Sequence, residues 1–368
     1  MQSTRLPDHI IELTAANPDV EVRLSITIDP LVLDEFQREA KAFPIVRIME
    51  GRKFHSEMEA QRYLQNLMLR ANGGEQLATS DEEKRSDVAR NLIAKAFLCS
   101  DKTERMAMAK EALAISSKCA EAYIVLAQGE DCLDKRVELL EKGTGIACTQ
   151  FDCARFENPE GFFWQKLATR PYMRCRSALA LALWESGKKQ SAIDHFKTLL
   201  KFNPYDSQGL RYHLLNWLLD VDAADTSIDE YFKEYEHERS AFGRYANSLW
   251  NFLRHGNDKR AIKSLDKAIE ANKFVPSFLC GVVASPDFRV KRVVRGSVPE
   301  AVACYRLGCD AWHKTDGAIA WLKERCATLL SSKTLLRKID SAEEWKSDGP
   351  WVGPMPMELS IAEKTVWH

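Results

Sequence analysis

No run of about 18 apolar residues occurs in the 368-residue sequence, so we expect no membrane-spanning helix. The N-terminal stretch MQSTRLPDHIIEL lacks the basic flank, the apolar stretch and the cleavage site of a secretory signal. A basic excess is missing as well, because 52 Lys and Arg residues nearly balance 53 Asp and Glu residues, for a net charge of −1. General nucleic-acid binding needs a basic face, so we expect no nucleic-acid partner.

The sequence motifs of common catalytic, nucleotide and zinc sites are absent too. The chain contains no CxxC pair, HExxH, GxGxxG, P-loop or GxSxG motif. Glu234 and His237 form an ExxH motif that resembles half of a di-iron carboxylate site, but such a site needs a second ExxH, and none occurs. We interpret these two residues as part of a solvated helix face, and we expect no catalytic residue, no cofactor and no metal.

Ten cysteines are present, mostly within helical patterns, where a free thiol behaves as a small buried hydrophobe. The closest spacings are Cys148 to Cys153 and Cys304 to Cys309, which are wider than the paired ligands of a structural zinc site. We therefore expect reduced, structural thiols. Reduced thiols indicate a location in the cytoplasm or the nucleus.

Helical periodicity is the main positive signal, and it is clearest in RCRSALALALWESGKKQSAIDHFKTLLKFNP, residues 174–204. This segment predicts a helix, a turn at Gly187, a second helix and a stop at residues 203–204. Ala180 and Ala192 are small where two paired helices must approach closely. Hydrophobic residues make up 45% of the chain, which is enough to bury a sizeable core between such helices.

A second unit with the same plan follows at residues 242–276, where Gly256 marks the turn and Pro276 the stop. Further pairs are predicted at residues 207–233 and at residues 297–330, the latter opened by a capping box of Ser297 and Glu300. One helix pair cannot bury both of its faces, so consecutive pairs must stack on one another. The repetition therefore predicts an all-α fold, an α-solenoid of helix pairs spanning residues 83–335.

The two ends of the chain differ from this middle region. Residues 1–82 predict a small mixed α/β region and linker, with strands at 20–28 and 43–49, helices at 31–43 and 56–70, and a polar linker from residue 73. Residues 336–368 are rich in proline and glycine near their middle and predict an extended tail. Trp345 and Trp351 either pin that tail to the solenoid, which we favour, or form a peptide motif for a partner.

Several sequence segments resemble those of a known family: ALAISSKCAEAYIVLAQ (112–128), TRPYMRCRSALALALWESGKKQSAIDHFKTLL (169–200), AIEANKFVPSFL (268–279) and KRVVRGSVPEAVACYRL (291–307). These segments resemble tetratricopeptide-repeat proteins of the suppression-of-tumorigenicity-7 type and their bacterial relatives. The phrase NPYDSQGLR (203–211) departs from the bacterial form at Ser207, where asparagine is usual. The resemblance implies an all-helical scaffold with no known chemistry. That family has a membrane-spanning N-terminus, which we do not expect here, so no membrane role is carried over.

An arginine cluster is the strongest candidate for a binding site. Arg170, Arg174 and Arg176 surround the start of a helix that Pro171 begins, and cations are unfavourable at the positive end of a helix. Either acidic residues of the chain itself, such as Glu157 or Asp206, or an acidic ligand must compensate for them. Arginine binds carboxylates through two parallel hydrogen bonds, which suits both alternatives.

Arg211 occupies the place on its helix that Arg174 occupies on the preceding first helix, and such helices line the inner groove of a solenoid. We take Arg170, Arg174, Gln208 and Arg211 as candidate partner-binding residues. A second basic stretch, RVKRVVR at 289–295, is better interpreted as a solvated loop than as a nucleic-acid or membrane contact, because the chain is neutral.

These observations predict a non-catalytic protein–protein interaction scaffold that binds a partner protein or acidic peptide in a helical-repeat groove. The alternative is an enzyme or an anion-binding regulatory protein whose site is assembled from residues far apart in the sequence. A deeply buried polar cluster would favour the enzyme, and a long open groove would favour the scaffold.

Overall fold

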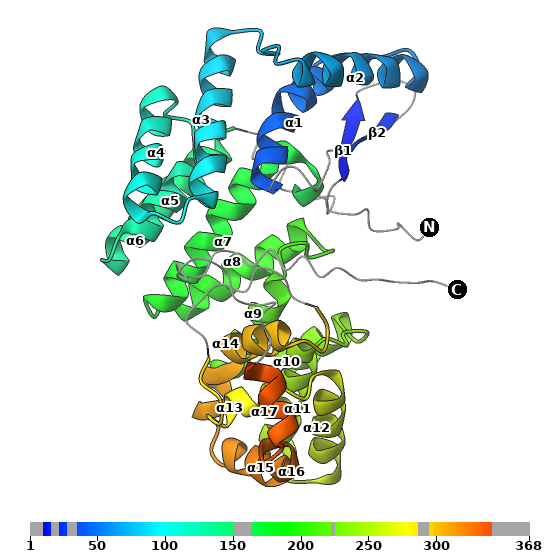
Figure 1. The fold of residues 1–368 in the computed structure, drawn as a ribbon, viewed down its shortest axis with the longest axis vertical. Coiled ribbons are helices and arrows are strands. Elements are labelled where there is room, and N and C mark those ends of the chain that lie inside the picture. The colour runs from blue at the N-terminus through cyan, green and yellow to red at the C-terminus, as the bar shows by residue number, and fades with distance from the viewer. Residues whose placement is uncertain are drawn as a thin grey trace. The chain divides into compact units, whose positions relative to one another are not determined.

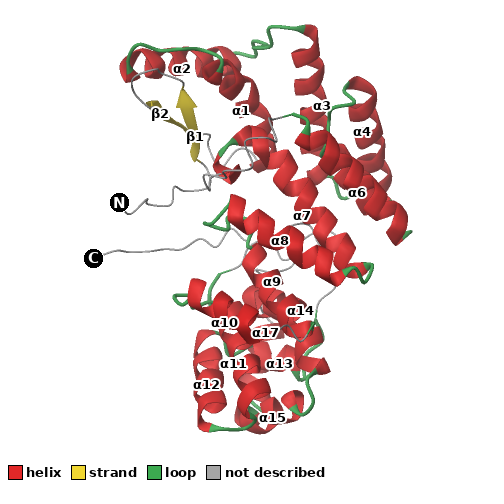
Figure 2. Cartoon of the chain, turned by 180° about the vertical axis from the view of Figure 1, so that it is seen from behind, coloured by secondary structure: helices red, strands yellow, loops and turns green. Residues whose placement is uncertain are grey.

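The computed structural model describes residues 10–15, 22–27, 35–150, 163–221, 225–285 and 294–340. These residues are almost entirely helical, as expected for an all-α protein (Figures 1 and 2). The chain divides into two units, Met1–Tyr205 and Asp206–His368. This division lies far from residue 82, where the sequence suggested the first boundary.

The N-terminal unit begins with a two-stranded antiparallel hairpin, drawn in yellow in Figure 2. Strand β1 (Ile10–Ala15) pairs with β2 (Val22–Thr27) so that Ile10 lies opposite Thr27 and Ala15 opposite Val22. Strand β2 lies within the segment predicted to be a strand. The hairpin contacts the first two helices, β1 against α1 and β2 against α2.

The prediction of a second strand in this region, at residues 43–49, is wrong. These residues belong to helix α1 (Glu35–Glu50), which continues through Pro44. The β-branched residues Ile45 and Val46 favour a strand locally, but Ala42, Ile45, Val46 and Met49 share one helical face that is buried in a core with α2. The apolar area buried by that face outweighs the local preference of the segment.

Helix α2 (Glu57–Asn72) begins as predicted, because the Ser56 side chain accepts a hydrogen bond from the Glu59 N–H. The polar linker predicted to follow is much shorter than expected, since α3 (Asp81–Leu98) starts within it. Ser80 and Glu83 form a capping box there, a start signal that the charged composition of the segment obscured.

The rest of the N-terminal unit is a succession of helices. They are α4 (Lys102–Ile115), α5 (Ala122–Gly129), α6 (Leu133–Cys148), the 3-10 turns η2 (Phe163–Gln165) and η3 (Leu167–Thr169), α7 (Arg170–Glu185) and α8 (Lys189–Phe202). From α3 to α8, each α-helix packs against the next one in the sequence (Figure 1). The turn predicted at Gly187 joins α7 to α8, and its φ of 80° is a conformation that suits glycine.

Enlarging Ala180 or Ala192 to leucine is expected to lower the free energy of unfolding by about 1–3 kcal/mol. Both residues are 0% exposed, on α7 and α8, which pack together, so a larger side chain must displace its neighbours. Urea denaturation of the two variants measures the effect. Ser191→Leu, at an exposed position beside Ala192, is the matched control. Wild-type stability of the Ala192→Leu variant would contradict the prediction that α7 and α8 are tightly packed at this contact.

The C-terminal unit contains α9 (Leu210–Asp220), α10 (Asp225–Glu234), α11 (Ala241–His255), α12 (Lys259–Ala271), α13 (Val275–Leu279), α14 (Val298–Lys314), α15 (Ala318–Arg325), α16 (Ala327–Leu330) and α17 (Lys333–Asp340). The predicted turn at Gly256 joins α11 to α12. In the core of this unit, the ring of Trp312 lies 6.4 Å from those of both Trp321 and Tyr245.

Two predictions for this unit need correction. The helix expected after residue 316 is divided at Cys326 into α15 and α16, and α17 carries the helical region past residue 335, where the tail was expected to begin. The tail residues Trp345 and Trp351 lie outside the described residues, as does most of the basic stretch 289–295.

Candidate functional site

The arginines at the start of α7 lie in a buried cluster within the N-terminal unit. Arg170 is the first residue of α7 and Pro171 lies in its first turn, as predicted. Arg170 and Arg174 are one helical turn apart and therefore share a face of the helix. Arg174 is only 3% exposed and Arg170 only 6%, so both guanidinium groups need partners inside the protein.

Glu39 of α1 is the carboxylate that both arginines hold. Arg174 donates two hydrogen bonds of 2.7 Å, from Nη1 to Oε2 and from Nη2 to Oε1 of Glu39. Arg170 donates from Nη1 to Oε1 of the same carboxylate. A second acid, Glu121, accepts a further bond of 3.0 Å from Arg174 Nη1. The guanidinium fork of Arg174 is thus filled by carboxylates of the chain itself.

The two acids of this cluster respond differently to their burial. Burial alone would raise the pKa of Glu39, but Arg174 and Arg170 outweigh it and lower that pKa from 4.5 to about 2. Burial raises the pKa of Glu121, against the opposing effect of Arg174, and the charge of Glu39 adds to the rise. Glu39 is therefore the firmly ionised partner, and Glu121 is the more readily protonated of the two acids.

A second, partly buried cluster lies at the start of α9 in the C-terminal unit. Arg211 Nη1 is 3.1 Å from Asp206 Oδ2, and Arg211 Nη2 is 3.1 Å from Glu238 Oε2. The hydroxyl of Tyr212 accepts from Arg211 at 2.6 Å and donates to Glu238 at 3.0 Å. Asp206 also accepts from the N–H of Leu210 at 2.7 Å. This acid therefore caps the first turn of α9 while it pairs with Arg211.

Asp206 has an unusual backbone conformation and a raised pKa. Its φ of 48° lies in the left-handed region, which non-glycine residues rarely adopt. Burial raises the pKa of Asp206 to about 6, although Arg211 and two backbone N–H groups act in the opposite direction. The pKa of Glu238 shifts in the opposite direction, because Arg211 and Ser240 lower it despite the burial of this carboxyl group.

These contacts correct the expectation that Arg170, Arg174 and Arg211 present themselves to the acid of a partner. The chain supplies the acids itself, which is the internal alternative raised by the sequence. Of the two internal acids named from the sequence, Asp206 does pair with Arg211, while Glu157 lies outside the described residues.

Two further sequence-predicted residues have clear positions. Gln208 is only 1% exposed, and within the described part of the chain neither polar atom of its side-chain amide has a hydrogen-bond partner. The side chain of His237 is 89% exposed and lies 3.3 Å from Glu236, so it is solvated as predicted. It does not lie on a helix face, because α10 ends at Glu234 and His237 belongs to the turn that follows.

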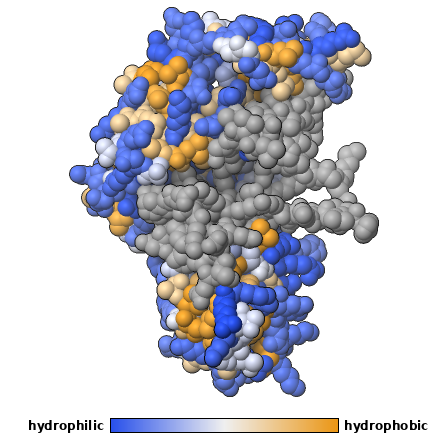
Figure 3. All heavy atoms as spheres, in the orientation of Figure 1, coloured by the Kyte–Doolittle hydropathy of each residue, from blue (hydrophilic) through white to orange (hydrophobic). Residues whose placement is uncertain are grey.

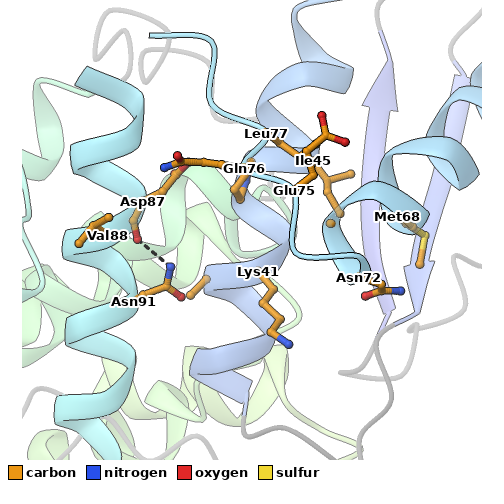
Figure 4. A pocket seen from close by; sticks show the side chains of 13 residues that line it. Lys41, Ile45, Met68, Asn72, Glu75, Gln76, Leu77, Asp87, Val88 and Asn91 are labelled. Atoms are coloured by element: carbon orange, nitrogen blue, oxygen red, sulfur yellow. Dashed lines mark hydrogen bonds between the residues drawn. The ribbon is translucent and has the colours of Figure 1, made fainter. Parts of the chain in front are cut away.

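An open pocket of about 230 Å³ lies elsewhere in the N-terminal unit, between α1, α2 and α3 (Figure 4). It is also lined by residues 75–77, which cross above α1 on the way from α2 to α3. Its lining combines apolar side chains with Lys41, Glu75, Asp87 and Asn91. Asn91 is fixed in place by a hydrogen bond of 2.9 Å from its Nδ2 to the carbonyl oxygen of Asp87.

Four of the cysteines that the structure describes are poor nucleophiles. Burial raises the pKa of Cys119 and Cys326 to about 12 and that of Cys280 and Cys309 to about 11. A thiol must ionise to attack a substrate, so these groups stay unreactive at neutral pH. The expectation of reduced thiols holds for eight described cysteines but not for Cys148, which is disulfide-bonded.

The purified protein is expected to contain less than one equivalent of zinc, because no cysteine or histidine pair has suitable spacing. In the described ranges, no group of three or more His, Cys, Asp or Glu side chains is arranged to hold a metal ion. Elemental analysis of the purified chain measures the content. Stoichiometric zinc whose removal by a chelator unfolds the protein would contradict this prediction.

Sequence reasoning missed Glu39, Glu121 and the pocket. Glu39 lies 135 residues before Arg174, and Glu121 lies 53 residues before it, so no local pattern joins them. The pocket also depends on three separate helices, one of which was partly predicted to be a strand. Among the described residues, no helix is both long enough and apolar enough to cross a membrane.

Comparison with known proteins gives one distant similarity. The chain is 25% identical over 258 residues to the protein described as "Protein ST7 homolog" from Caenorhabditis elegans, a match that covers 60% of this chain and 47% of that relative. The chain thus spans about half the length of the relative it matches. The similarity supports an ST7-like relationship, and the name of that relative states no activity or partner. No protein-family model and no solved structure matches the chain.

Proposed function

We propose that this chain is a non-catalytic scaffold, a solenoid of tetratricopeptide-like helix pairs that binds a partner protein or peptide. The observation that carries the proposal is the packing of each helix from α3 to α8 against its successor. Helices stacked in sequence order create an extended surface, which repeat proteins use to bind other polypeptides.

The polar clusters support a binding role over a catalytic one. Arg174 is buried, Arg211 is partly buried, and both are paired with carboxylates of the chain, so we assign their charges to holding helices together rather than to meeting a substrate. The buried thiols are held in their protonated form. Eight free thiols also favour a reducing compartment, and we place the protein in the cytoplasm or nucleus.

A binding assay followed by mass measurement tests the proposal. A partner captured by the tagged chain is purified separately and titrated against the chain by calorimetry. A scaffold binds it saturably and leaves its intact mass unchanged after prolonged incubation. An enzyme, the alternative function, would change the partner's mass at a rate that scales with the concentration of the chain. Failure of any purified partner to bind directly would also overturn the proposal.

A further inference from the structure

An asparagine followed by a glycine ends helix α2. Asn72 is the last residue of the helix, Gly73 follows it, and both are exposed. The backbone nitrogen of a glycine can attack the side-chain amide of a preceding asparagine, because no Cβ shields its approach. No other asparagine of the sequence is followed by glycine. The end of α2 therefore carries a chemically reactive pair of residues.

The backbone of this turn requires glycine at only one of its two glycine positions. Gly74 has a φ of 82°, in the left-handed region that favours glycine, and its N–H donates to the carbonyl oxygen of Ala71 at 3.1 Å. Gly73 has a φ of −74°, which any residue adopts. A Cβ added to Gly73 would lie 3.4 Å from the nearest carbonyl oxygens, an ordinary contact distance. The glycine that makes Asn72 reactive is thus not the one that the turn needs.

The reaction is an internal substitution followed by hydrolysis, and asparagine is among the residues that undergo such slow chemistry. The nitrogen of Gly73 loses its proton to solvent and bonds to Cγ of Asn72, and the side-chain nitrogen leaves as ammonia. Water then opens the cyclic imide. Cleavage of the new bond gives aspartate, and cleavage of the original peptide bond gives isoaspartate. The net change is the uptake of one water molecule and the release of one ammonia molecule.

Two contacts restrain the nitrogen that must react. The N–H of Gly73 donates to the carbonyl oxygen of Leu69 at 2.9 Å, so this bond has to open first. Arg70 donates bonds of 2.8 and 2.5 Å to Glu75 and so spans the turn. Both contacts lie in the last turn of the helix, where opening costs least. Figure 3 shows mostly hydrophilic residues at this end of the N-terminal unit, around α2 and its linker to α3, in keeping with access for water.

The reaction would change the charge of the pocket between α1, α2 and α3, because Asn72 lines it (Figure 4). Lys41 is the basic residue of that lining. Asp87, an acid of the lining, already accepts hydrogen bonds from Arg47 at 3.0 Å and from Arg90 at 3.1 Å. A carboxylate at position 72 adds a negative charge to this wall. It also stands at the C-terminal end of α2, where the helix dipole disfavours negative charge.

We propose that Asn72 is a site of spontaneous deamidation, which gives the end of α2 a carboxylate and makes the wall of the pocket more acidic. The chain itself is the substrate, and water is the reagent. Because the new charge opposes the helix dipole, the modified chain should have a lower melting temperature than the original. The inference is independent of the proposed scaffold function.

Incubation of the full chain at mildly alkaline pH tests the site, with ion-exchange chromatography and peptide mass mapping of the samples over time. We expect a more acidic species to accumulate, with the mass change confined to the peptide that contains Asn72 and with both aspartate and isoaspartate at that position. Asn66 is the internal control, because it is an exposed asparagine of the same helix that is followed by Leu67. Modification of Asn72 no faster than that of Asn66 would overturn the proposal.

Variants of the two glycines separate the chemistry from a general loosening of the turn. Gly73→Ala should slow the reaction about tenfold, because its Cβ hinders the attacking nitrogen, while circular dichroism shows unchanged helix content. Gly74→Ala is the matched control, since it strains the turn but leaves the reactive pair and should not slow the reaction. Asn72→Asp should elute with the acidic species and melt below the wild type. An unchanged rate in Gly73→Ala, or a melting temperature of Asn72→Asp at or above that of the wild type, would contradict the inference.

Discussion

Replacing Arg174 by alanine is expected to lower the free energy of unfolding of the N-terminal unit by about 3–5 kcal/mol. The change removes both forked hydrogen bonds to Glu39 and the bond to Glu121, and it leaves two buried acids, of which Glu39 keeps Arg170 as a partner. Urea denaturation followed by circular dichroism measures the loss. The exposed pair Lys118–Glu82 provides a control, since Lys118→Ala should cost less than about 1 kcal/mol.

The pH dependence of stability gives an independent check of the same cluster. Glu39 has a folded-state pKa of about 2, below the value of 4.5 that it takes when unfolded. Its contribution is therefore present above pH 4.5 and is lost as the pH falls toward 2, by about 1.4 kcal/mol for each unit of the shift. Glu39→Gln should flatten this part of the stability curve. An unchanged curve would show that the ion pairs contribute nothing to folding.

Replacing Arg211 by alanine is expected to destabilise the C-terminal unit by a similar amount, about 3–5 kcal/mol. The buried Asp206 and the partly buried Glu238 would then lose the cation that pairs with both of them. Tyr212 would also lose the donor to its hydroxyl. Unfolding monitored by tryptophan fluorescence measures the effect, and Arg254→Ala, which breaks a partly exposed ion pair with Asp229, serves as control.

Combining the two substitutions distinguishes internal pairing from a partner clamp. Because Arg174 and Arg211 belong to different units, their effects on stability should add within about 0.5 kcal/mol. A clamp would give the opposite result: nearly wild-type stability with a large loss of partner binding. That outcome would require the arginines to exchange their internal acids for those of a partner.

The helix pairs could be predicted from the sequence because their signals are local. The turn glycines Gly187 and Gly256 and the small residues Ala180 and Ala192 lie within one helix pair, so periodicity and turn chemistry locate them together. The structure has these turns and buries both alanines completely. Where the same kind of local reasoning was applied to residues 43–49 it failed, because burial against α2 decided the conformation.

The partners of the arginines could not be predicted in this way. The sequence does show that Arg170 and Arg174 stand at an unfavourable end of a helix and therefore need acids. It does not show which acids, because Glu39 reaches them only after α1 has packed into the core of its unit. Asp206 was the exception, since it lies five residues before Arg211 and the pairing is local.

The ion pair between Glu39 of α1 and Arg174 of α7 also has a consequence during synthesis of the chain. Glu39 leaves the ribosome well before Arg174, which follows it by 135 residues. At roughly 5–20 residues per second, α1 waits on the order of ten seconds for its cation. The ion pair between α1 and α7 therefore forms only after α7 has emerged.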